Sequence, residues 1–97
     1  MVTFAEKDDK FVCSFSGQMN TENCYKTQEL VLGEVRKCRK PVIFDMKKVT
    51  YVSSVFLSMC IQVLREAGAE NFMILNVDPS VKKVFKVAGL DMRITMA

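Results

Sequence analysis

The sequence contains no histidine, and this absence excludes several kinds of chemistry. Without an imidazole, the chain cannot form a Ser-His or Cys-His nucleophile arrangement. Its four cysteines are widely spaced and form no CxxC pair, so a zinc site is not expected. We predict no metal, no cofactor and no catalytic residue, and we interpret Cys13, Cys24, Cys38 and Cys60 as small, reduced, buried side chains.

The chain also lacks a long hydrophobic run. Its longest mostly apolar stretch, residues 55–64, contains Ser58 and Gln62, whereas a membrane-spanning helix needs about 20 apolar residues. Charged residues fill positions 6–10, where a signal peptide would have its apolar segment. We therefore expect a cytoplasmic protein that is not inserted into a membrane.

Charge gives no sign of a nucleic-acid partner. The 97 residues carry a net charge of +3 and are expected to form one domain, residues 1–97. The basic positions gather at residues 36–40 and at Lys82, Lys83 and Lys86. Neither group is interleaved with aromatic residues or glycine in the way that proteins binding single-stranded nucleic acid are, so we interpret both as solvated faces.

Hydrophobic periodicity predicts the element order β-β-α-β-α-β-α-β. The predicted strands are residues 2–5, 11–16, 42–44, 72–77 and 93–96, and the predicted helices are 21–38, 54–67 and 79–88. Strands separated by single helices favour parallel pairing, whereas the first two strands favour an antiparallel hairpin. The fold class is therefore α/β, with a mixed sheet covered by helices. The continuous apolar run at 72–77 predicts a strand covered on both faces.

Polar residues stand where the predicted helices begin. Asn20 or Thr21 is expected to cap the first helix, Ser53 the central one, and Asp78, followed by a proline, the last. The Ser53 hydroxyl is expected to accept from an unpaired N–H of the first turn. Asp45, at the end of the central strand, is expected to cap the following loop rather than to act as an acid or base.

The central helix carries apolar residues on more than one face. Leu57, Cys60, Ile61 and Leu64 have the spacing of one helical face, and we predict that this face lies in the core. Further apolar residues lie around the same helix, namely Val55, Phe56, Met59 and Val63.

Residues 42–57, VIFDMKKVTYVSSVFL, resemble the central signature of STAS domains, the anti-sigma factor antagonist family. That signature is an apolar strand followed by Asp-Leu-x-x-Val-x-Tyr/Phe-x-Asp-Ser-Ser-Gly-Leu. Residues 16–20 and 76–90 are similar to two further family motifs, in the right order. The resemblance implies a STAS-like fold from which the family's common C-terminal helix is absent.

The resemblance also implies a function. Family members bind a protein partner, often an anti-sigma factor that is also a serine kinase. Phosphorylation at the start of the central helix breaks that interaction. Ser53 matches the phosphoacceptor and Ser54 matches the serine after it, so Ser53 is the expected site and Ser54 the less favoured one.

The match departs from the family pattern around these serines. Val52 and Asn20 replace acidic residues, and Val55-Phe56-Leu57 replaces Gly-Leu-Gly. Either a kinase adapted to an apolar site phosphorylates Ser53, or Ser53 is only a helix cap and the domain binds its partner constitutively.

The same departures lead us to expect a partner-binding patch. It consists of Asn20, Val52, Val55, Phe56 and Met59. In the alternative, a second layer of structure covers these apolar side chains.

Three functional hypotheses follow. The first is a non-enzymatic regulatory module that binds an anti-sigma factor or serine kinase in partner switching. The second is a STAS accessory subunit of an ABC transporter ATPase of the lipid type, which binds constitutively without phosphorylation. The third and least favoured is an enzyme using Asp45 or the cysteines. A homodimer is also compatible with the sequence.

Overall fold

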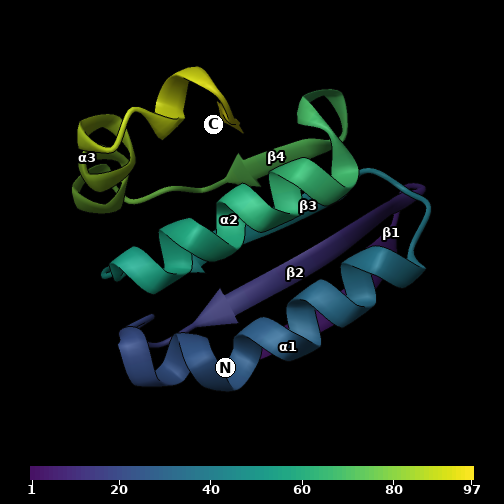
Figure 1. Cartoon of the computed structure of the whole chain (residues 1–97), viewed down its shortest axis with the longest axis horizontal. Helices are drawn as coiled ribbons and strands as arrows, with labels where there is room; N and C mark the ends of the chain where they lie inside the picture. The colour runs from purple at the N-terminus through teal and green to yellow at the C-terminus, as the bar shows by residue number, and fades with distance from the viewer.

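The structure is a computed structural model that describes residues 1–97. Its five strands follow one another across the sheet in chain order (Figure 1). The strands are β1 (Val2–Lys7), β2 (Lys10–Ser16), β3 (Val42–Lys48), β4 (Phe72–Leu75) and β5 (Thr95–Met96). The helices are α1 (Thr21–Lys37), α2 (Ser54–Ala67) and α3 (Pro79–Val87), and no helix follows β5 within residues 1–97.

The predicted mixed sheet is confirmed. Strands β1 and β2 are antiparallel, and β2, β3, β4 and β5 pair in parallel. Asp8 and Asp9 form the tight hairpin turn between β1 and β2, both with positive φ angles, a conformation that aspartate tolerates better than most residues. Strand β3 continues beyond the predicted end at Phe44 to Lys48, and its alternating pattern includes buried Met46.

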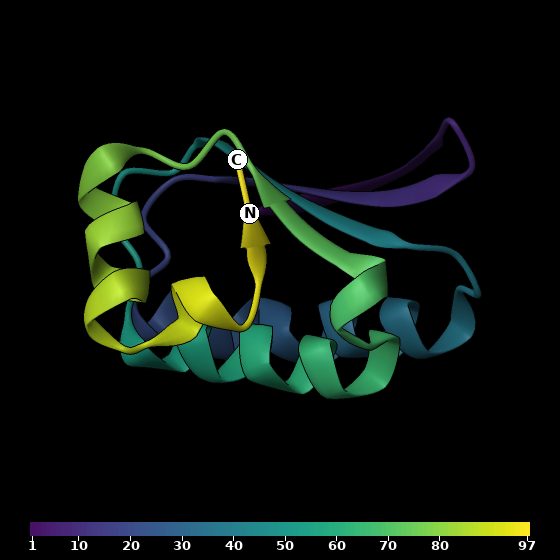
Figure 2. The ribbon, with the colours of Figure 1, turned by 90° about the horizontal axis from the view of Figure 1, so that it is seen from above.

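The helices do not cover both faces of the sheet. Figure 2 shows α1 and α2 lying on one face, with α3 standing at one end of the molecule. Side chains of β4 therefore alternate: Phe72 and Ile74 are buried, whereas Met73 is 36% exposed on the other face. The prediction that this apolar run is covered on both faces is wrong, because its second face is open.

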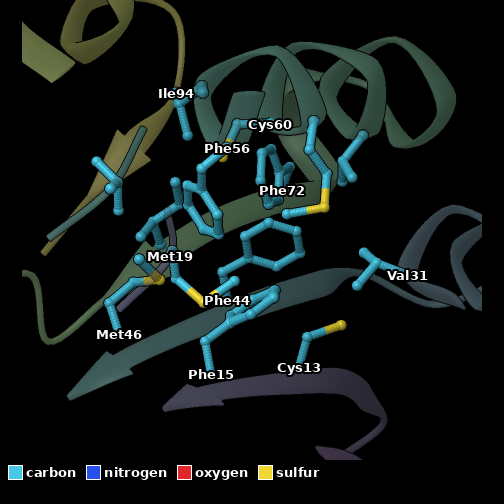
Figure 3. Packing of buried hydrophobic residues seen from close by; sticks show 14 of the residues in the cluster. Cys13, Phe15, Met19, Val31, Phe44, Met46, Phe56, Cys60, Phe72 and Ile94 are labelled. Atoms are coloured by element: carbon cyan, nitrogen blue, oxygen red, sulfur yellow. The ribbon is translucent and has the colours of Figure 1, made fainter. Parts of the chain in front are cut away.

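Aromatic side chains fill the space between the sheet and α2. The ring of Phe44 on β3 lies between those of Phe15 and Phe72, at centroid distances of 4.8 and 4.9 Å (Figure 3). Phe56, from the first turn of α2, packs edge-on against Phe15 at 5.2 Å. This cluster attaches the start of α2 to the middle of the sheet.

The buried stripe of α2 differs from the predicted one. Phe56, Met59, Cys60, Val63 and Leu64 are buried, whereas Leu57 and Ile61 are only half-buried. Both stripes follow the same i, i+3, i+4, i+7 spacing, so periodicity could not choose between them. The bulkier Phe56 and Met59 enter the core because the sheet and α1 leave room for large side chains there.

The predicted ends of the helices are largely confirmed. Asn20 caps α1 by accepting from the Asn23 N–H at 2.9 Å, and Asp78 caps α3 by accepting from the Ser80 N–H at 3.0 Å. Gly68, with a φ of 88°, ends α2 in a backbone conformation that other residues rarely adopt. None of the helices combines the length and apolarity needed to cross a membrane.

Candidate functional site

Two loops join at the carboxyl ends of β2 and β3. The Met19 N–H donates to the Tyr51 carbonyl at 3.0 Å, and the Ser53 N–H donates to the Met19 carbonyl at 2.9 Å. This parallel bridge connects the loop before α1 to the loop before α2. Because neighbouring parallel strands end at the same edge of a sheet, the bridge places the starts of α1 and α2 side by side.

Ser53 occupies the N-cap position of α2, but its hydroxyl does not cap the helix. Its backbone is extended, with a φ of −97° and a ψ of 172°, as an N-cap requires, yet the side chain accepts no hydrogen bond from α2. The Ser53 hydroxyl instead donates to Cys24 Sγ of α1 at 3.6 Å, and the residue is only 7% exposed. The predicted capping bond is therefore wrong, because the hydroxyl is turned into the protein interior.

Ser54 differs from Ser53 in every one of these respects. It is the first residue of α2, it is exposed, and its hydroxyl makes no hydrogen bond within the chain. The first turn of α2 contains no acidic residue, so no carboxylate of this turn lies beside its N–H groups. The resulting partial positive charge favours an anionic group on either serine.

Most of the predicted partner-binding patch lies in the core. Phe56 and Met59 are fully buried and Val52 nearly so, and a partner cannot contact them without unfolding the domain. For these three residues the predicted surface role is wrong, and the alternative of a covering layer is correct. Asn20 and Val55 are half-buried and remain partly accessible beside the serine pair.

An apolar groove between α2 and α3, which sequence reasoning did not identify, lies beside this site. It measures about 390 Å³ and is lined by Leu57 of α2, by Ser80 and Lys83, and by Val84, Val87 and Ala88 of α3. We call it the α2–α3 groove. Val84 is 38% exposed and Val87 is 81% exposed. Only Val81 and Phe85 of α3 are buried, because α3 touches the rest of the molecule along one narrow edge.

Lysines flank the α2–α3 groove. Lys82, Lys83 and Lys86 line a neighbouring hollow of α3 together with Asp91. The Ser80 hydroxyl reaches the Thr50 carbonyl at 3.5 Å, which ties the start of α3 to the loop that precedes Ser53. The groove, its basic rim and the two serines therefore belong to one corner of the molecule.

Asp45 and the cysteines have structural roles. Asp45 accepts from the Lys47 N–H at 3.1 Å and from the Asn76 side-chain amide at 3.0 Å, which confirms it as a loop cap. All four cysteines are free, and burial raises the pKa of the Cys13 thiol to about 12. Burial also raises the pKa of Cys60, so both thiols stay protonated and unreactive at neutral pH. No group of three or more histidine, cysteine or acidic side chains could hold a metal ion.

The comparison with known families decides what this fold is. A family model described as the STAS domain matches residues 2–97. The chain belongs to the STAS domain family. The match covers nearly the whole of residues 1–97, as the resemblance of the central signature predicted.

Among known proteins, this STAS domain is similar to BtrV of Bordetella bronchiseptica, named as an anti-sigma factor antagonist. The two are 24% identical over 91 residues, which cover 91% of this chain and 78% of BtrV. The fold of this STAS domain matches that of the Bacillus protein SpoIIAA in its unphosphorylated form, with a TM-score of 0.80 and 17% identity. The match covers 100% of this chain and 88% of SpoIIAA.

A further structural match is a chain of the MlaFEDB complex from Acinetobacter, determined in an ATP-bound conformation. The TM-score is 0.73 and the identity is 20%, with coverage of 94% of this chain and 96% of the other. The predicted fold class, a STAS-like mixed α/β sheet, is thus confirmed.

Proposed function

We propose that this STAS domain is a non-enzymatic binding module of the anti-sigma factor antagonist type, which docks a regulatory protein at the corner formed by its serine pair and the α2–α3 groove. The observation that carries the proposal is the exposed apolar groove next to the start of α2. The groove brings the exposed side chains of Val84 and Val87 together with Leu57, and this apolar surface is available to a partner.

The side chains at this corner indicate what kind of surface the partner presents. The apolar centre formed by Leu57, Val84 and Val87 suits an amphipathic surface, and the rim of Lys82, Lys83 and Lys86 attracts acidic residues around it. The similarity to BtrV, named as an anti-sigma factor antagonist, supports an anti-sigma factor as the partner. The resemblance of the Ser53 region to the family signature adds that this partner is also a serine kinase. Such a partner would be met in the cytoplasm.

Phosphorylation of Ser53 would switch this contact. The γ-phosphoryl group of ATP would move to Ser53 Oγ as its bond to the β-phosphate oxygen breaks, and the hydroxyl proton would leave to a base of the kinase. The product adds about −1.5 to −2 charges at the start of α2, which the open N–H groups of the helix tolerate. An apolar, acidic-rimmed partner would not tolerate them. Ser54, which is exposed, is the second candidate acceptor.

Two measurements test the proposal. Intact-mass spectrometry of the protein from its own cells, with fragmentation of residues 49–65, should show one phosphate on Ser53 under some growth or stress condition. Affinity purification of the tagged chain should recover a serine-kinase ATPase of the anti-sigma type.

A matched pair of variants makes the second measurement specific. Leu57→Asp should abolish recovery of that kinase, whereas Leu30→Asp, which alters an exposed leucine of α1 away from the groove, should not. Equal recovery with both variants would remove the α2–α3 groove from the proposal. Recovery of only a second copy of the chain would replace the proposed kinase with a homodimer.

The transporter hypothesis has a specific observation in its favour, the structural match to a chain of the MlaFEDB complex. Under this second candidate function, the same corner binds an ABC transporter ATPase constitutively. An unmodified mass under all conditions, together with co-purification of a transporter ATPase that depends on Leu57, would favour this second function over the first.

A further inference from the structure

Three hydrogen bonds form a closed ring between α1 and the start of α2. The Ser53 N–H donates to the Met19 carbonyl at 2.9 Å, and the Cys24 thiol donates to the same oxygen at 3.3 Å. The Ser53 hydroxyl closes the ring by donating to Cys24 Sγ at 3.6 Å. Met19 and Cys24 are fully buried, so water does not compete for these bonds.

Only a neutral thiol can take part in this ring as both donor and acceptor. Burial raises the pKa of Cys24, so its sulfur keeps the proton that it donates to Met19 while its lone pairs accept from Ser53. The ring therefore persists at neutral pH.

The Ser53 hydroxyl has a second position available. The backbone of Ser53 has the extended conformation of an N-cap, and a rotation about its Cα–Cβ bond would bring the hydroxyl over the unpaired N–H groups of Val55 and Phe56. Capping and the bond to Cys24 are thus alternative states of one side chain. A sulfur is a weak acceptor, so the bond to Cys24 adds only a little to the stability of the inward state, and a change at residue 24 can shift the balance between the two states.

We infer that Cys24 is a positioning residue for Ser53: its thiol holds the serine hydroxyl inside the protein, and this inward state and phosphorylation of Ser53 exclude each other. A phosphoryl group cannot occupy the place of the inward hydroxyl, because the fully buried Cys24 and Met19 fill the space around it. The phosphorylated side chain must point outward, over the start of α2. The regulatory consequence rests on the proposed function, but the side-chain equilibrium does not.

Nuclear magnetic resonance on purified protein tests the equilibrium without any kinase. In Cys24→Ala, three-bond Hα–Hβ couplings should show the outward rotamer of Ser53 rising about twofold relative to the inward one, the shift that the loss of one weak hydrogen bond to sulfur gives. Hydrogen exchange of the Phe56 amide should slow, because the freed hydroxyl caps it more often. Cys24→Ser, which keeps a hydroxyl that can donate to Met19 and accept from Ser53, should restore the inward rotamer.

Cys13→Ala is the matched control, since Cys13 is equally buried but lies on β2 without contact to Ser53. It should lose stability comparably and leave the Ser53 couplings unchanged. An unchanged rotamer in Cys24→Ala, or the same change in Cys13→Ala, would overturn the inference. If Cys24→Ala does not fold, an unchanged rotamer in Cys24→Val, which fills the site without an acceptor, would equally overturn it.

Phosphate occupancy on Ser53 in the native cells separates this inference from the proposed function. If Ser53 is phosphorylated, Cys24→Ala should raise the occupancy about twofold over the wild type, and Cys24→Ser should not. A rotamer shift with no phosphate in any variant would keep the positioning role and reject the switch. If the phosphate occupancy of Ser53 is the same in wild type and Cys24→Ala, the phosphorylation switch is supported and the positioning role of Cys24 is rejected.

Discussion

The starts of α2 and α3 have the same residue pattern but different capping contacts. Each has a polar residue at the cap position, Ser53 or Asp78, and a buried apolar side chain at the third helical position, Phe56 or Val81. At α3 the Asp78 carboxylate turns toward its own helix and accepts from Ser80. At α2 the Ser53 hydroxyl turns away from its helix and bonds a different one.

This difference separates a structural helix start from one that is available for regulation. The cap of α3 is made by residues within two positions of each other, Asp78 and Ser80. The first-turn N–H groups of α2 have no side-chain partner. A helix start of this kind can accept a new group without the loss of an existing cap.

The largest effect should come from removing the buried anchors. Phe56→Ala should destabilise the domain by about 3–5 kcal/mol, because it deletes a fully buried ring that packs against Phe15. Val81→Ala at the equivalent position of α3 should cost only about 2 kcal/mol, since it removes two methyl groups. Urea denaturation measures both. Equal losses would contradict the view that α2 carries the heavier structural anchor.

A smaller effect is expected at the cap of α3. Asp78→Ala should lower the melting temperature by a few degrees, because the N–H of Ser80 loses its acceptor. Thermal unfolding followed by circular dichroism is the measurement. Asp91→Ala, which alters an acidic residue after the same helix, serves as the control and should have less effect.

The same cap should also depend on pH. Hydrogen bonds from the Ser80 side chain and then from its backbone N–H lower the pKa of Asp78 below its ordinary value. A carboxylate of this kind contributes stability above its unfolded pKa and loses it as the pH falls through the folded pKa. The melting temperature of Asp78→Ala should therefore be lower than that of the wild type at pH 7, and the two melting temperatures should become equal in strong acid. A difference that persists there would show that the charge does not act in capping.

The smallest effect should be at Ser53. A serine that caps its helix costs about 1 kcal/mol when it is replaced by alanine. Because the Ser53 hydroxyl does not cap α2 and bonds only a weak sulfur acceptor, Ser53→Ala should change the free energy of unfolding by less than about 0.5 kcal/mol. A loss of a full kilocalorie in urea denaturation would mean that the hydroxyl caps α2 in solution.

Local sequence signals predicted the element order, the caps of α1 and α3, and the loop cap at Asp45. Each of these depends on residues a few positions apart, where turn and cap chemistry acts directly. The parallel arrangement followed from the spacing of strands and helices. The fold of the chain was therefore accessible from its sequence.

The site was accessible only in part, because its features depend on distant residues. The direction of the Ser53 hydroxyl is decided by Cys24, which lies 29 positions away. The choice between the Phe56 and Leu57 stripes of α2 depends on how the sheet and α1 pack around that helix. The α2–α3 groove could be predicted only with knowledge of how α3 is oriented, because the spacing of Val84 alone is typical of a buried residue.

The order of the strands has a consequence for synthesis. Since β1, β2, β3, β4 and β5 lie side by side in the order in which they leave the ribosome, each new strand can add to the edge left by the preceding one. No strand has to be inserted between two that are already paired. The bridge between Met19 and Val52 closes when β3 joins β2, so the loops around the serine pair can assemble while the last third of the chain is still being made.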